Sequence, residues 1–244
     1  MIRTVLRIIA GRVMPKIAYP VFRGPLKGLK FILGAASGNG GGASIHFGLV
    51  EPEQTNSFLK ILKPGFVFFD IGANVGYYTL LASRLIGEKG KIFAFEPSTR
   101  NLIYLEKHIR INKLRNAMII PAACSDEISL SLFEKTNDCA LGHFVKTSDV
   151  QGNNIDLVPA ITIDSVVQKT NTLPDVIKID VEGAEMKVLQ GCVSVLSQKH
   201  PVIFLSVHSD QLRDDCKSFL KQYNYEAIPL DTSENGEPYE FMFS

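Results

Sequence analysis

The stretch from Phe66 to Ala82 constrains the fold more than any other part of this 244-residue chain. It begins with an apolar and aromatic run, Phe66 to Asp70, which predicts a strand buried on both faces, as in a parallel sheet. Gly72, Asn74 and Gly76 then allow a sharp turn, because glycine adopts positive φ without steric cost and asparagine tolerates it. A helical stretch follows, and such a strand–turn–helix unit brings bare backbone close to a ligand at the carboxyl end of a strand.

The turn differs from the G-x-G-x-x-G fingerprint that holds a pyrophosphate. Its glycine spacing is shorter, it lacks the middle glycine, and Asp70 comes just before it. An acid at this point disfavours a phosphate and favours a ligand with cationic groups, such as S-adenosylmethionine with its amine and sulfonium. Glu96 ends a second predicted strand 20 residues after Gly76, where a carboxylate could accept hydrogen bonds from both ribose hydroxyls. The alternative is a structural βαβ turn with two strand-end acids.

A second group of acids follows another predicted strand, 176–179. Asp180, Glu182 and Glu185 place three carboxylates at one strand-to-helix corner, ahead of a predicted helix over 184–196. Acids are favourable at a helix N-terminus because of the helix dipole, so Glu185 could simply stabilise that helix. The same three acids could also hold a divalent metal such as Mg²⁺, which prefers oxygen ligands, but we favour this less. His208 ends the next strand, 202–207, at the rim where ligands bind in such sheets.

Composition places the chain among globular proteins, with 45% hydrophobic and 21% charged residues and a net charge of +1 that indicates no particular partner. The four cysteines show neither close pairing nor metal-ligand spacing. They predict free thiols in a reducing compartment, and therefore a cytoplasmic protein.

The amino-terminal region differs from the rest, since residues 1–50 contain seven Lys or Arg and no acid. Residues 1–14 have the apolar spacing of a short basic amphipathic helix, too short for a signal-peptide core or a membrane span. Such a helix could contact an anionic membrane surface peripherally, pack on its own domain, or pack on another subunit of a homo-oligomer. Glycines are frequent from Gly34 to Gly48 and predict a flexible loop or lid. We therefore separate a segment 1–47 from a domain 48–244.

The remaining pattern alternates helices and strands, as expected for an α/β fold. Ser125 and Asp126 follow a third strand, 117–121, where either could hydrogen-bond an adenine or form an ordinary polar turn. Residues 136–158 lack periodicity and predict a loop that contacts substrate. Asp164 is a plausible N-cap of a short helix. The other predicted elements are helices over 51–62, 99–112 and 210–222, a strand over 128–133, and a final antiparallel hairpin over 225–244.

These motifs together resemble the FkbM-type methyltransferases over roughly residues 48–208. The matching runs are Glu51-Pro52-Glu53, Lys63-Pro64-Gly65, Asp70-Ile71-Gly72-Ala73-Asn74-Val75-Gly76-Tyr77-Tyr78-Thr79, Phe95-Glu96-Pro97 and Lys178-Ile179-Asp180-Val181-Glu182-Gly183-Ala184-Glu185. The resemblance implies a class I methyltransferase fold, Rossmann-like and doubly wound, mostly parallel with a carboxy-terminal antiparallel hairpin, in strand order 3-2-1-4-5-7-6. It also implies S-adenosylmethionine-dependent O-methylation of a sugar, glycan or natural-product hydroxyl.

The resemblance assigns roles to individual residues. Asp70, Gly72 and Asn74 would line the methionine end of the cofactor, and Asp180 would border the transferred methyl. Many relatives carry a Glu two residues before the His of the fifth strand, where this chain has Ser206. The full set of predicted cofactor contacts is Asp70, Gly72, Ala73, Asn74, Gly76, Tyr78, Glu96, Ser125, Asp126 and Asp180.

An alcohol acceptor needs its proton removed during methyl transfer, and a positioned base contributes about 10²–10⁴-fold. His208 is the first candidate for this base, with Asp180 and Glu182 as the other predicted catalytic residues. The alternatives are a nucleic-acid or N-directed methyltransferase, a nicotinamide enzyme, and a non-catalytic module that binds S-adenosylmethionine. The sequence shows no basic patch interleaved with aromatic residues, the pattern that would favour a nucleic-acid substrate.

Overall fold

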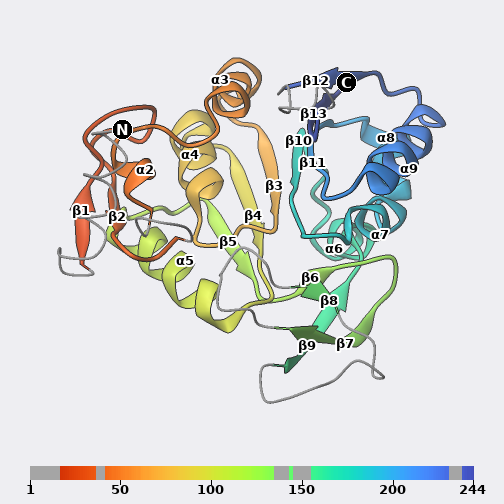
Figure 1. Ribbon diagram of the computed structural model, residues 1–244, viewed down its shortest axis with the longest axis horizontal. Coiled ribbons are helices and arrows are strands. Elements are labelled where there is room, and N and C mark those ends of the chain that lie inside the picture. The colour runs from red at the N-terminus through yellow and green to blue at the C-terminus, as the bar shows by residue number, and fades with distance from the viewer. Residues whose placement is uncertain (1–16, 37–41, 135–142, 145–154, 231–237) are drawn as a thin grey trace.

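The computed structural model describes residues 17–36, 42–134, 143–144, 155–230 and 238–244. Seven strands form its central sheet, in the order β12-β13-β11-β10-β3-β4-β5 (Figure 1). They are β3 (Val67–Ile71), β4 (Lys91–Phe95), β5 (Ala117–Ile120), β10 (Val176–Ile179), β11 (Val202–Ser206), β12 (Ala227–Pro229) and β13 (Glu240–Phe243). Numbered along the chain and read from the β5 edge, this is 3-2-1-4-5-7-6, so the predicted order is confirmed. Only β13 runs antiparallel to its neighbours β11 and β12.

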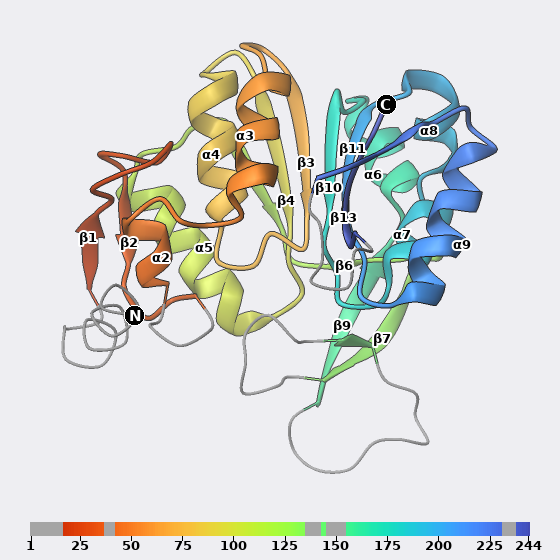
Figure 2. The same cartoon turned by 45° about the horizontal axis from the view of Figure 1, so that its top comes forward.

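Helices cover both faces of this sheet (Figures 1 and 2). One face carries α3 (Pro52–Ile61), α4 (Tyr77–Ile86) and α5 (Thr99–Ile111), and the other carries α6 (Ile163–Thr170), α7 (Glu185–Gln190), α8 (Val193–Lys199) and α9 (Asp210–Lys221). Neighbouring residues of β3 point to opposite faces: Phe68 packs in the α3–α4 core, and Phe69 packs in the α6–α9 core. This two-sided burial explains why the central strands are continuously apolar.

A small second sheet adjoins the main one, in the order β6-β9-β7-β8. It contains β6 (Ala123–Cys124), β7 (Ser129–Glu134), β8 (His143–Phe144) and β9 (Ile155–Ile161). The prediction of a loop over 136–158 was therefore wrong at 143–144 and from Ile155 onward, where pairing with β7 compensates for the weak local pattern. Residues 136–142 and 145–154 lie outside the described part.

The amino-terminal residues that the structure describes pack against the domain. The hairpin of β1 (Ala18–Pro20) and β2 (Lys30–Ile32) joins the α3–α4 core through Val21 and Phe31. The short helix α2 (Ala43–His46) also buries Ile45, so the end of the glycine-rich stretch is packed and is not the flexible loop that we predicted. The amphipathic segment 1–14 lies outside the described residues. Among the described helices, none is both long and apolar enough to cross a bilayer.

Candidate functional site

The glycine turn lies at the carboxyl end of the central strand β3. Gly72, Asn74 and Gly76 all adopt positive φ, at 79°, 50° and 95°. A Cβ at Gly72 would lie 1.8 Å from the backbone oxygen of Asp180, and one at Gly76 would lie 2.6 Å from Leu105 Cδ1. Gly72 is therefore required sterically as well as conformationally, whereas Gly76 is favoured chiefly by its positive φ. The turn and the corner that bears Asp180 are in direct backbone contact.

Asp70 is fully buried just before this turn. Its Oδ2 accepts a hydrogen bond of 2.6 Å from Thr79 Oγ1, while its Oδ1 has no hydrogen-bond partner among the described residues. Burial raises the pKa of Asp70, although the charge of Lys178 opposes the shift. A buried carboxylate oxygen without a partner fits a neighbouring cationic ligand, because such a group is costly to leave unpaired.

Glu96 follows β4 and holds the turn in place. Its Oε2 accepts the amide of Asn74 at 2.8 Å, and its Oε1 accepts the amide of Ser98 at 2.8 Å and Nδ2 of Asn101 at 3.4 Å. Burial raises its pKa to about 7, against the lowering effect of these hydrogen bonds. Each carboxylate oxygen has two acceptor positions, so Glu96 has capacity for a ligand hydroxyl beside the turn.

Other predicted cofactor residues make mainly internal contacts. Ala73 is buried, and its amide donates to Phe95 O at 2.9 Å, so it shapes the turn through its backbone. Ser125 and Asp126 follow β6, where the hydroxyl of Ser125 donates to Asp126 Oδ1 at 2.8 Å. A Cβ at Gly191 would lie 2.0 Å from Ser125 O, so this corner packs against the end of α7.

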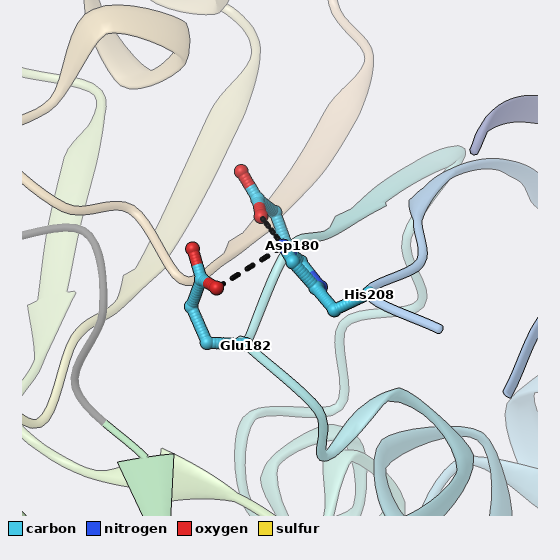
Figure 3. Close-up of side chains that lie close together, drawn as sticks. All are labelled: Asp180, Glu182 and His208. Carbon is cyan, nitrogen blue, oxygen red and sulfur yellow. Dashed lines mark ion pairs between the residues drawn. The ribbon is translucent and has the colours of Figure 1, made fainter. Parts of the chain in front are cut away.

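His208 lies beside two acids from the end of β10 (Figure 3). Its Nε2 is 3.3 Å from Glu182 Oε2 and 3.7 Å from Asp180 Oδ1. Its Nδ1 is 2.6 Å from Oε1 of Glu185, whose side chain is fully buried. Glu182 reaches this position from a left-handed backbone, with φ at 53°. The structure thus brings together all three predicted catalytic residues, His208, Asp180 and Glu182.

The electrostatics of this group favour a protonated His208. Burial disfavours the imidazolium, but the hydrogen bond and charge of Glu185, with the charges of Glu182 and Asp180, outweigh it and raise the pKa of His208 to about 9. Burial also disfavours the charged form of Asp180, but the Lys178 ammonium at 2.9 Å keeps its pKa below the usual value.

The residues that could hold a metal ion differ from the predicted set. Asp180, Glu182 and His208 offer ligand atoms that all lie within 4.8 Å of one another. Glu185 is instead committed to His208 and to the amide of Gly183, at 2.9 Å. Among the described residues only this spacing favours a metal, and the ion pairs of His208 with Asp180 and Glu182 account for the same spacing.

Sequence reasoning assigned no role to Lys178, Glu51 or Glu240, which lie around the predicted contact Tyr78 or beside it on the α3 side of the same site. Lys178 is buried within β10, with its Nζ 5.0 Å from the ring centre of Tyr78, and Tyr78 donates a 2.5 Å hydrogen bond to Glu51 Oε2. A lysine inside an otherwise apolar strand was the available signal for this cluster. Glu240 on β13 is paired with Ser206 and accepts its hydroxyl at 2.7 Å. No local signal in the sequence indicates that pairing.

A family model and curated relatives both identify this chain as similar to methyltransferases. A family model described as the methyltransferase FkbM domain matches residues 70–227. The hexuronic acid methyltransferase AglP of Haloferax volcanii is 28% identical over 178 residues, which cover 70% of this chain and 68% of that protein. A ribosomal RNA large subunit methyltransferase E from Chromobacterium violaceum is 43% identical, but over 43 residues that cover 18% of this chain and 21% of that protein.

Two solved structures show the same fold. The FkbM methyltransferase of Methylobacillus flagellatus has a TM-score of 0.57 at 15% identity, and the match covers 78% of this chain. This chain spans 50% of the length of that protein. A putative rRNA-methylase of Clostridium thermocellum has a TM-score of 0.51 at 11% identity, covering 79% of this chain and 92% of that one. At these identities the likeness establishes the fold alone.

Proposed function

The chain belongs to the FkbM methyltransferase family, a family of S-adenosylmethionine-dependent enzymes, and we propose that it transfers methyl from this donor to a hydroxyl of a sugar, glycan or natural product. The observation that carries the proposal is the contact between the glycine turn and the Asp180 corner. A Cβ at Gly72 would lie 1.8 Å from Asp180 O, so a donor on the turn and an acceptor beside Asp180 and His208 would share one wall. The similarity to a hexuronic acid methyltransferase supports a sugar acceptor.

S-adenosylmethionine supplies an electrophilic methyl on a sulfonium whose leaving group is neutral, so the protein has mainly to position the acceptor. Asp70, with its unpartnered buried oxygen, would face the cationic methionine end. Gly72, Ala73, Asn74 and Gly76 would offer the backbone of the turn, and Glu96 would accept a ribose hydroxyl. Tyr78, Ser125 and Asp126 remain proposed contacts, the last two toward the adenine.

His208 would take the proton of the acceptor hydroxyl through Nε2. Glu185 holds Nδ1 at 2.6 Å, which fixes the ring so that Nε2 faces Asp180 and Glu182. Asp180 would orient the hydroxyl, and Glu182 would stabilise the imidazolium that forms. A divalent metal on Asp180, Glu182 and His208 is the alternative way to acidify the hydroxyl.

The test separates binding of the donor from chemistry. With methyl-labelled donor and a panel of sugar and polyol acceptors, we expect His208→Ala to lower turnover about 10²-fold or more while leaving the calorimetric affinity for S-adenosylhomocysteine unchanged. His200→Ala is the matched control, because His200 lies on the surface and bonds Tyr223 O. Glu96→Gln should weaken S-adenosylhomocysteine binding about tenfold or more, since hydrogen bonds to a charged group contribute about 1.5–3 kcal/mol.

Full turnover in His208→Ala would remove His208 from the mechanism. Turnover that disappears with a chelator and returns with Mg²⁺ or Mn²⁺ would favour the metal alternative. A wild-type protein that binds neither the donor nor S-adenosylhomocysteine would refute the proposed function itself.

A further inference from the structure

Four residues on the α3 side of Asp180 form a surface that the mechanism above does not use, which we call the acidic wall: Glu51, Gln54, Ser206 and Glu240. Gln54 Nε2 and Ser206 Oγ both donate to Oε2 of Glu240. Gln54 is 2% exposed, and its amide oxygen is buried without a hydrogen-bond partner among the described residues. A buried acceptor without a donor is costly, and it fits a ligand that brings a hydroxyl or an ammonium.

The charges around this wall are predominantly negative. Burial raises the pKa of Glu240 to about 7 against the hydrogen bond from Ser206, and the charges of Asp180 and Glu51 add to the increase. The positive charge of Lys178 acts on Glu240 of this wall. Its Nζ is already paired with Asp180 Oδ2 at 2.9 Å, and its side chain is only 3% exposed. A carboxylate on an acceptor would therefore meet like charges at the wall, because the nearby cations, Lys178 and the protonated His208, are already paired with carboxylates of the site.

We propose that the acidic wall selects the acceptor by charge: it admits a neutral or amine-bearing polyhydroxyl compound and disfavours one that carries a carboxylate. The inference rests on the proposed function, because the wall adjoins the site of methyl transfer at Asp180, whose charge acts on Glu240. It separates this chain from its hexuronic acid methyltransferase relative in acceptor class. Glu240 and Glu51 are the residues that set the preference, and Gln54 adds a hydrogen-bond acceptor for a sugar hydroxyl or amine.

The experiment compares three methyl glycosides that differ in one group: the glucoside, the glucosaminide and the glucuronide. Each is titrated calorimetrically, at neutral pH and low salt, into protein saturated with S-adenosylhomocysteine. We expect the glucuronide to bind about tenfold or more weakly than the glucosaminide, the size expected for one unit charge near unscreened carboxylates. Glu240→Gln should reduce the ratio of the glucuronide Kd to the glucosaminide Kd severalfold. Glu226→Gln, an exposed acid at the opposite end of β13, should leave it unchanged.

Equal or tighter binding of the glucuronide would overturn the proposal, as would a ratio that Glu240→Gln does not alter. Absence of binding by all three glycosides would also overturn the proposal, since the wall would then not discriminate between hexoses by their charge. Each of these results leaves the proposed function standing whenever the same preparation binds S-adenosylhomocysteine. Failure to bind S-adenosylhomocysteine refutes the proposed function and the charge preference together.

Discussion

His208 is held by three carboxylates whose side chains differ in burial. Glu185 is fully buried and touches Nδ1, while Asp180 and Glu182 are partly exposed and face Nε2. A buried carboxylate on one ring nitrogen fixes the orientation of the imidazole and raises its basicity. The same arrangement keeps the ring protonated at neutral pH, because the pKa of His208 lies near 9.

A proton acceptor with this pKa should work best in mild alkali. We expect an NMR titration of the His208 ring to give a midpoint near 9, and kcat/KM to rise with pH toward the same value. Glu185→Gln removes the charge and should move both midpoints down toward the ordinary histidine value of about 6.5. A ring that titrates near 6.5 in the wild type, or a midpoint that Glu185→Gln does not move, would contradict this account of the site.

Single residues were predictable where the sequence places chemistry at a strand end. Asp70, Glu96, Asp180 and His208 each follow an apolar run, and parallel strands bring such positions to one edge of a sheet. Glu240 and Gln54 could not be found this way. Glu240 meets Ser206 through the antiparallel register of β13, and Gln54 reaches Glu240 from α3. Neither contact is encoded in a local pattern.

At the scale of elements, the predicted helix over 184–196 is two helices, α7 and α8, that meet at Gly191 and Cys192. The apolar spacing continues through the junction, so periodicity alone indicates one helix. The backbone of Gly191 lies against Ser125, where a Cβ would come within 2.0 Å of its carbonyl oxygen. The two helices therefore meet where the chain packs closely against the residue that follows β6, far away in sequence.

The residue predicted to cap α6 instead caps α8. Thr162 is the N-cap of α6, since its Oγ1 accepts the amide of Ser165, while Asp164 accepts the amides of Ser194 at 2.9 Å and Val195 at 3.1 Å. The prediction that Asp164 caps its own helix was wrong. The choice of an Asp was sound, because a carboxylate satisfies unpaired amides at a helix start.

Asp164→Ala should lower the free energy of unfolding by about 1–2 kcal/mol, because two amides at the start of α8 lose their acceptor. Asp164→Asn keeps one acceptor oxygen and should cost less, which makes it the graded control. Denaturant unfolding measures both variants. Equal stability of Asp164→Ala and the wild type would show that water replaces the cap fully.

At the scale of the whole molecule, the strand order was predictable because each strand carries its own apolar signal and the family resemblance supplies the connectivity. The attachment of the amino-terminal hairpin to the domain was not predictable from the sequence. His108 on α5 makes this connection: its Nε2 accepts the amide of Ile32 at 2.9 Å, and its Nδ1 donates to Val75 O at 2.6 Å. One buried ring thus links β2 to the glycine turn.

Both hydrogen bonds require a neutral His108, and burial lowers its pKa to about 4. The unfolded chain takes up this proton near the ordinary histidine pKa of 6.5, so the stability that His108 contributes is complete above pH 6.5 and is lost as pH falls toward 4. The loss should approach about 3 kcal/mol. Urea unfolding across this range should show a steeper decline for the wild type than for His108→Gln; parallel curves would contradict it.

The pairing of Ser206 with Glu240 has a consequence for how sequences of this family are compared. A column-by-column alignment records Ser206 as the loss of an acid on the fifth strand, although β13 returns a carboxylate to the adjoining position. The double variant Ser206→Glu with Glu240→Ser places the carboxylate on β11 instead of β13. Comparing its acceptor range with that of the wild type would show whether either strand can carry the carboxylate without changing the acceptors.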